Sequence, residues 1–226
     1  MTEPTGTSVE TVEGKVFFLM SMSLDGFIAP AGMELEHAGD PSYKDWARKW
    51  GALQSWAFPL KFFRENLRLG DGGETGPDDD LARDTFERTG VTILGRRMFD
   101  GGERFWPDEA PFHTPVFVVT HHRRDAWERP GGTTFHFVDD GIESALSQAR
   151  EAAGGRDVRI GGGADLVRQY LDAGLVDEFT LSVSPIVMRE GVRLFDRIEH
   201  RLAGLELVDT VASPRATHLT YARPAA

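Results

Sequence analysis

The chain has 226 residues and a formal net charge of −11, because 36 acidic side chains outnumber 25 basic ones, and it contains no cysteine. This length and a hydrophobic content of 40% fit one large or two small globular domains and exclude a wholly disordered chain. The acidic balance disfavours nucleic-acid binding, and the absence of cysteine excludes disulfides, iron–sulfur clusters and cysteine-bound zinc.

The N-terminal residues 1–14 are polar and rich in Thr, Glu and Gly, which predicts a disordered tail without a targeting signal. The uncharged stretch Val16–Leu24 that follows is too short for a bilayer, which requires about 20 apolar residues. Together with the lack of cysteines, these features indicate a cytoplasmic protein that does not associate with membranes.

The first regular element is the continuous apolar run Val16–Met20, which is typical of a strand buried on both faces. Asp25, Gly26 and Pro30 then signal a loop. Residues 31–90 are less regular, and we interpret them as a helical and loop insertion in the domain.

Aromatic and acidic residues mark this insertion. Pro41–Phe58 predicts a helix in which Trp46 and Trp50 share a face, since they are four residues apart. We interpret these two residues and Trp56 as packing residues, with a stacking site as the alternative. The acid-rich segment Glu74–Asp84 is interpreted as a solvated face.

From Asp78 onward, helices and strands alternate. Helices are predicted to begin at Asp78, at Asp139 or Asp140, and after Gly163, and to end at Gly90, Gly154 and Gly174. The predicted strands are Val91–Leu94, Val116–Thr120, Thr134–Val138, Val158–Ile160, Glu178–Val187, Leu205–Val211 and His218–Ala222. This order indicates one α/β domain over residues 15–226, with a mostly parallel sheet, helices on both faces and an antiparallel pair of C-terminal strands.

The sharpest motif is Gly161-Gly162-Gly163, which lies between a strand and a helix. Glycines allow a ligand to approach the backbone closely, and the free N–H groups at a helix start attract phosphate. A tight strand-to-helix turn without a ligand is an equally open interpretation. The motif is not the dinucleotide fingerprint of Rossmann folds, which would require glycine where Leu166 stands.

Two further strand ends carry basic residues. Gly95-Arg96-Arg97 follows one predicted strand, and arginine offers a fixed fork of donors to phosphate oxygens. Thr120–Arg124 follows the next strand and is suited to the 2′-phosphate that distinguishes NADP from NAD. For both segments, an ordinary solvated loop is the alternative. A metal site is not expected, because adjacent histidine side chains diverge.

These motifs follow the strands in a specific order: Gly-Arg-Arg, then Thr-His-His-Arg-Arg, then Gly-Gly-Gly, with Ser23–Ala29 after the first strand. Together with Glu178–Phe195, this order resembles the dihydrofolate reductase superfamily. Within it, the chain is similar to stand-alone relatives of the reductase domain of bifunctional riboflavin-synthesis deaminase-reductases. The likeness covers Lys15–Ala29 and Val91–Arg223.

The resemblance implies a dihydrofolate-reductase-like fold with NADPH bound across the carboxyl ends of the strands. The residues implied in cofactor binding are Met20, Ser21, Ile28 and Ala29 near the nicotinamide, Gly95, Arg96 and Arg97 at the phosphates, Thr120 and His121 at the adenosine ribose and its 2′-phosphate, and Gly161, Gly162, Gly163, Ala164 and Leu166 at the pyrophosphate.

The implied activity is NADPH-dependent reduction of a small heterocyclic substrate, similar to that of 5-amino-6-(5-phosphoribosylamino)uracil reductase. Asp25 is the candidate proton donor, although a turn formed by Asp25-Gly26 is the alternative. Other open functions are a dihydrofolate reductase, a flavin-dependent reductase, and a non-catalytic nucleotide- or pterin-binding module. Relatives of this kind commonly pair, so a homodimer is also expected.

Overall fold

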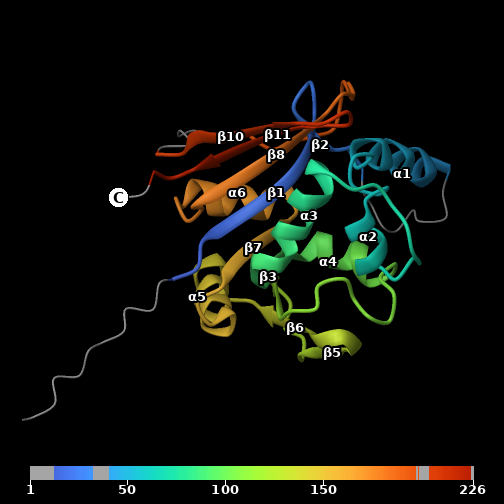
Figure 1. The fold of residues 1–226 in the computed structure, drawn as a ribbon. Coiled ribbons are helices and arrows are strands. Elements are labelled where there is room, and N and C mark those ends of the chain that lie inside the picture. The colour runs from blue at the N-terminus through green and yellow to red at the C-terminus, as the bar shows by residue number, and fades with distance from the viewer. Residues whose placement is uncertain (1–12, 33–40, 197, 199–203, 225–226) are drawn as a thin grey trace, which may run out of the picture.

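A computed structural model of the chain describes residues 13–32, 41–196, 198 and 204–224. Most of the tail predicted for residues 1–14 lies outside these ranges. In the described residues, nine strands form one sheet in the order β10-β11-β8-β1-β7-β3-β4-β6-β5, and β2 pairs with β9 separately (Figure 1). The strands are β1 (Val16–Ser23), β2 (Phe27–Ala29), β3 (Thr89–Gly95), β4 (Val116–Val119), β5 (Trp127–Arg129), β6 (Thr133–Val138), β7 (Asp157–Gly162), β8 (Glu178–Ser184), β9 (Val192–Arg193), β10 (Glu206–Ala212) and β11 (Thr217–Ala222). The α-helices are α1 (Pro41–Leu53), α2 (Lys61–Asn66), α3 (Pro77–Arg88), α4 (Arg96–Glu103), α5 (Ile142–Ala153) and α6 (Ala164–Asp172).

The central strands of the sheet run in the same direction. β1 pairs in parallel with β7 and β8, β3 pairs in parallel with β7 and β4, and β4 pairs in parallel with β6. β11 is antiparallel to both β8 and β10, which confirms the predicted C-terminal antiparallel pair. Because parallel strands end at the same side, the loops after these central strands meet at one edge, which we call the carboxyl edge.

Alternation along the strands divides the interior into two layers. In β1, the buried Val16 and Phe18 face a core shared with α5 and α6, whereas Leu19 packs on the other side with Trp56 and the α2–α3 region. A further cluster places Phe99 of α4 against β3, β4 and β6. Helices therefore cover both faces of the sheet, as predicted.

Several predicted boundaries differ from the observed ones. The helix predicted for Pro41–Phe58 ends at Leu53, and turns lead to α2, which was not predicted. Pro59 separates these turns from α2, since proline disfavours the helical conformation of the residue before it. The strand predicted to end at Val187 ends at Ser184. α4 was also missed, because Gly101 and Gly102 weaken its helical signal.

Tryptophan packing agrees with the sequence-based interpretation, but the solvated acidic face does not. Trp46 and Trp56 are buried, and the Trp46 and Trp50 rings stack with centroids 6.0 Å apart. Asp78 and Asp79, by contrast, are only 8% and 4% exposed. The prediction of a solvated face over Glu74–Asp84 was therefore wrong at these two positions, because α3 turns its first-turn carboxylates toward polar groups inside the protein.

Candidate functional site

Three of the predicted ligand-binding turns lie next to one another at the carboxyl edge. β7, β3 and β4 are consecutive in the sheet and parallel, so their ends are adjacent. Gly162 is the register partner of Leu94, and Gly95 is the register partner of Val119. The turns that follow these strands are Gly163 into α6, Arg96 into α4, and Thr120. The strand order therefore brings together segments that are up to 67 residues apart in sequence.

Two helix N-termini face this edge without side-chain caps. Gly95 is the N-cap of α4 and Gly163 is the N-cap of α6, and neither position supplies a capping side chain. The two turns are also close, because a Cβ at Gly95 would lie 3.4 Å from the backbone nitrogen of Gly163. The first N–H groups of both helices are thus available to an anion, which the helix dipole also favours.

The two predicted phosphate-binding arginines have different surroundings. Arg96 Nε donates to Asp100 Oδ1 at 2.7 Å within α4. Arg97 Nη2 lies 3.1 Å from Asp165 Oδ2 on α6, and the Arg97 side chain is 86% exposed. Sequence reasoning missed Asp165, although an acid in the first turn of a helix proposed to bind phosphate is a signal that could have been noticed.

The third turn is less uniformly basic than its sequence indicates. Thr120 is buried, and its hydroxyl accepts a hydrogen bond from the His122 N–H at 3.1 Å. The His121 side chain is exposed. Arg123 pairs with Asp139 at 2.6 Å, and Arg124 pairs with Glu103 and lies over the Phe99, Trp127 and Phe137 rings. Of the two cofactor residues predicted at this turn, Thr120 is buried and His121 is exposed, as are its neighbours His122 and Arg123.

The residues predicted near the nicotinamide fall into two groups. Met20 and Ser21 lie on β1, beside β7, and a Cβ at Gly162 would lie 3.9 Å from Met20 Cε. The Ser21 hydroxyl donates to Gln54 and accepts from Trp56 Nε1, which joins this strand to the segment after α1. Ile28 and Ala29 lie on β2, which pairs with β9 in the separate two-stranded sheet. Ile28 is buried in the main core.

Of the residues predicted at the pyrophosphate, some are packed in the interior and others border open space. Leu166 is buried and packs in the main core, so its side chain anchors the start of α6 to the sheet. A Cβ at Gly161 would lie 2.7 Å from Leu94 Cδ2, which indicates that this glycine is required by packing. Gly163 has open space in the same direction, with no atom within 4 Å of an added Cβ. Gly163 and the start of α6 at Ala164 are thus the positions where a ligand can approach, whereas Gly162 is buried.

Asp25 anchors the loop after β1. Its carboxylate accepts hydrogen bonds from the Met188 N–H at 3.0 Å, the Arg189 N–H at 2.7 Å and the Ser23 hydroxyl at 2.7 Å. Desolvation raises the pKa of Asp25, but these hydrogen bonds outweigh it and lower the pKa to about 2. Asp25 is therefore ionised at neutral pH and ties the β1–β2 turn to the loop that follows β8. Its predicted role as proton donor stays a prediction.

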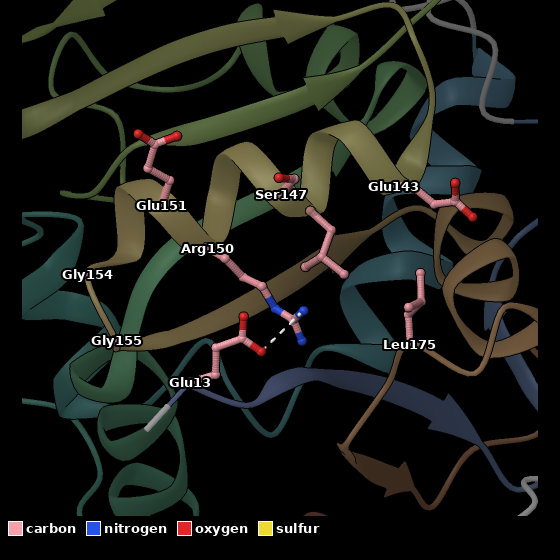
Figure 2. Close-up of a pocket in the computed structure, with 9 residues that line it drawn as sticks. Glu13, Glu143, Ser147, Arg150, Glu151, Gly154, Gly155 and Leu175 are labelled. Carbon is pink, nitrogen blue, oxygen red and sulfur yellow. Dashed lines mark ion pairs between the residues drawn. The ribbon is translucent and has the colours of Figure 1, made fainter. Parts of the chain in front are cut away.

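A separate hollow runs along α5 toward the N-terminal segment (Figure 2). Its lining includes Leu146, Glu151 and Leu175, and Arg150 pairs there with Glu13 at 3.4 Å. None of the predicted site residues lines it, so it does not belong to the candidate site.

The donors at the carboxyl edge are suited to a phosphate-bearing cofactor. Two uncapped helix N-termini and the cations of Arg96 and Arg97 surround glycines that leave the backbone accessible. In the described part of the chain, no group of three or more His, Asp or Glu side chains is arranged to hold a metal ion. Within the same ranges, no helix has both the length and the apolar character needed to cross a bilayer.

Fold and site together define an α/β protein of the dihydrofolate reductase type. Dihydrofolate reductase from Enterococcus faecalis, complexed with NADP(H), has a similar fold: the TM-score is 0.53 at 17% identity, over 94% of this chain and 98% of that one. A riboflavin biosynthesis protein from Shewanella sp. PV-4 is similar with a TM-score of 0.61 at 20% identity, over 93% and 99% of the two chains.

The chain belongs to the RibD C-terminal domain family, whose model matches residues 14–219. Among curated relatives, the uncharacterized protein YyaP of Bacillus subtilis is 36% identical over 140 residues, which are 59% of this chain and 73% of YyaP. The resemblance seen in the motifs is thereby confirmed.

Proposed function

We propose that this protein is an NADPH-dependent reductase of a small heterocyclic substrate, with chemistry like the reduction of a ribosylamino-pyrimidine phosphate. The observation that carries the proposal is the adjacent pair of uncapped helix N-termini beside Arg96 and Arg97. Membership in the RibD C-terminal domain family and the fold shared with an NADP(H)-bound reductase support it.

In this proposal each of the three turns binds a different part of the cofactor. Gly95, Arg96 and Arg97 bind phosphate oxygens from α4, and the backbone around Gly163 binds them from α6. Thr120 and His121 lie at the adenosine ribose and its 2′-phosphate. NADPH supplies the hydride when it is bound.

The β1 and β2 residues form the other end of the proposed site. Met20 borders Gly162, and the Gln54 and Trp56 side chains hold the Ser21 hydroxyl in place. These residues position the nicotinamide end, with Ile28 and Ala29 on the neighbouring β2 strand. The proposal further includes a cytoplasmic location and a homodimer, and size-exclusion chromatography with light scattering tests the latter.

The decisive experiment compares NADPH with NADH. Calorimetry and thermal unfolding should show binding of NADPH, with a stabilisation of about 2.7 kcal/mol at a hundredfold excess over Kd. NADH should give a much smaller shift because it lacks the 2′-phosphate. Absence of any shift with either nucleotide at millimolar concentration overturns the proposal.

One observation favours a second function, that of a non-catalytic nucleotide- or pterin-binding module. With a pKa of about 2, Asp25 lacks at neutral pH the proton that the predicted donor role requires. A protein without a proton donor would bind NADPH without turning it over. Loss of NADPH absorbance with a panel of pyrimidine, pterin and carbonyl substrates favours the reductase, and inertness with the whole panel favours the module.

A further inference from the structure

Arg159 occupies an unusual place for a cation. It lies on β7, the middle strand of the nine described in the main sheet, and its register partners are Phe17 on β1 and Thr92 on β3. Its neighbours Val158 and Ile160 point to the opposite face, where both are fully buried in the main core. The Arg159 guanidinium lies on the α3 side, 4.2 Å from the centroid of the Phe86 ring.

The described residues supply no counter-charge to this guanidinium. Among the described residues, Arg159 has no hydrogen-bond or ion-pair partner, and its Nε is enclosed without one. Arg88 provides a contrast on the same face. It also lies over an aromatic ring, that of Phe17, but it pairs with Asp157 at 3.3 Å and with Glu178 at 2.6 Å.

The two buried acidic groups at the start of α3 are already engaged elsewhere. Asp78 accepts from His218 at 2.7 Å, and Asp79 accepts from the Phe62 N–H at 2.6 Å. A chain with 36 acidic residues thus places none of its described carboxylates against Arg159. Burial lowers the pKa of Arg159 to about 10, which shows that the site disfavours the charge it carries.

The Phe86 ring attracts the guanidinium but supplies no counter-charge, so the charge of this half-buried side chain is only partly compensated. An apolar side chain of similar size would be tolerated well at such a position. Residues that weaken a fold in this way are typical of binding sites. Arg159 also keeps part of its surface accessible, since it is neither fully buried nor exposed. A ligand can therefore reach the guanidinium, and a negatively charged one would supply the missing partner.

Thr92 adds a second unpaired donor beside Arg159. It is fully buried, and its Oγ1 has no hydrogen-bond partner. Its side chain is on the same face as Arg159, because Thr92 Cγ2 would lie 3.0 Å from a Cβ at Gly161. A guanidinium and a hydroxyl on neighbouring strands match the acceptors of an oxyanion, which binds both kinds of donor strongly.

We propose that Arg159 and Thr92 bind an oxyanion group, phosphate or carboxylate, of the substrate. The assignment of this oxyanion group to a substrate rests on the proposed reductase function, whereas the oxyanion site itself does not depend on that function. Arg159 is three residues before Gly162, which corresponds to about 10 Å along the strand. The proposed oxyanion site therefore lies under α3, at some distance from the carboxyl edge.

Thermal unfolding without NADPH tests the site. Inorganic phosphate and acetate are titrated separately, with sodium chloride at matched ionic strength as the reference. Wild-type protein should gain melting temperature with at least one oxyanion beyond the chloride effect, and the two titrations identify which chemistry binds. Arg159→Met should abolish this gain. It should also melt at or above the wild-type temperature in chloride, because an unpaired buried charge has been removed.

Two further variants keep the test decisive. Thr92→Val preserves shape and should weaken oxyanion binding several-fold even if Arg159→Met fails to fold. Arg83→Met is the matched control, because Arg83 also lies near an aromatic ring, Phe62, but is paired with Glu65 and Asp79. It should retain the full oxyanion-dependent gain.

The proposal is overturned if neither oxyanion stabilises the wild type beyond chloride. It is equally overturned if Arg159→Met or Thr92→Val retains the wild-type response. Binding of NADPH is measured separately by calorimetry. Failure of NADPH to bind the wild type contradicts the reductase function and leaves the oxyanion site standing, whereas NADPH binding without an oxyanion response contradicts the site alone.

Discussion

Arg97 and Asp165 join the N-terminal turns of α4 and α6 through an ion pair of 3.1 Å between Nη2 and Oδ2. Both side chains are exposed, Arg97 by 86% and Asp165 by 63%. An exposed pair of this kind contributes little to stability, about 0–1 kcal/mol. Its importance lies in its position, because the Asp165 carboxylate lies where the proposed cofactor phosphates approach.

Removal of this carboxylate should therefore strengthen NADPH binding. Asp165→Asn frees Arg97 and removes a negative charge from a helix N-terminus, where one charge is worth about 0.3–1 kcal/mol, so Kd should fall about two- to fivefold. Isothermal titration calorimetry measures the change. Asp172→Asn removes the same charge at the far end of α6 and should leave Kd unchanged. An unchanged or higher Kd in Asp165→Asn would contradict the placement of the phosphates.

Loss of either arginine should weaken NADPH binding. A hydrogen bond to a charged group contributes about 1.5–3 kcal/mol, so Arg96→Ala and Arg97→Ala should each raise Kd by a factor of about ten or more. Arg48→Ala is the control, because it removes one positive charge from an exposed position on α1. Equal Kd values for wild type and both site variants would remove these arginines from the cofactor site.

The Asp25 contacts predict a pH-dependent contribution to stability. The pKa of Asp25 is lowered in the folded protein to about 2 from an ordinary value of 3.8. The stabilisation is therefore fully present above pH 3.8 and is lost as the pH falls toward 2. Asp25→Asn should melt at a lower temperature than the wild type at neutral pH, because its amide cannot accept from both the Met188 and Arg189 N–H groups as the carboxylate does.

Calorimetric melting curves between pH 2 and pH 5 measure this difference. The gap between wild type and Asp25→Asn should narrow as the pH decreases. A constant gap would show that the Asp25 charge does not hold the loop. If Asp25→Asn also retains full turnover with an identified substrate, the proton-donor prediction is wrong.

The buried polar cluster formed by His218 of β11, Asp78 and Ser182 should be important for stability. His218 is 1% exposed and lies 2.7 Å from Asp78 Oδ1 and 2.8 Å from Ser182 Oγ. His218→Ala leaves Asp78 Oδ1 and Ser182 Oγ without their hydrogen bonds to the histidine, while Asp78 Oδ2 keeps the bond from the Ser213 hydroxyl. The change also opens a cavity beside Trp56, so the free energy of unfolding should fall by about 2–4 kcal/mol.

Urea denaturation of His218→Ala gives this value directly. Asp84→Asn, at an exposed position in the interior of α3, serves as the control and should change stability by no more than about 0.5 kcal/mol. A loss below 1 kcal/mol for His218→Ala would indicate that water replaces the histidine at little cost, about 0–2 kcal/mol.

The amino-acid sequence alone predicted most strands of the main sheet, their mostly parallel direction and the glycine turn after β7, whereas the edge strand β5 was missed. The apolar run Val16–Met20 and the glycines after Ile160 are local signals, because periodicity and turn chemistry act over a few neighbouring residues. The short helix α4 was missed for the same reason, since its glycines weaken the local pattern.

Partnerships between side chains were decided only by the tertiary structure. The burial of Asp78 against His218, the pairing of Arg97 with Asp165 and the isolation of Arg159 all depend on which strands and helices become neighbours. These residues are separated by up to 140 positions in the chain, and local patterns do not encode such distances. Charge and hydrogen bonding in the candidate site therefore follow from the order of the strands in the sheet.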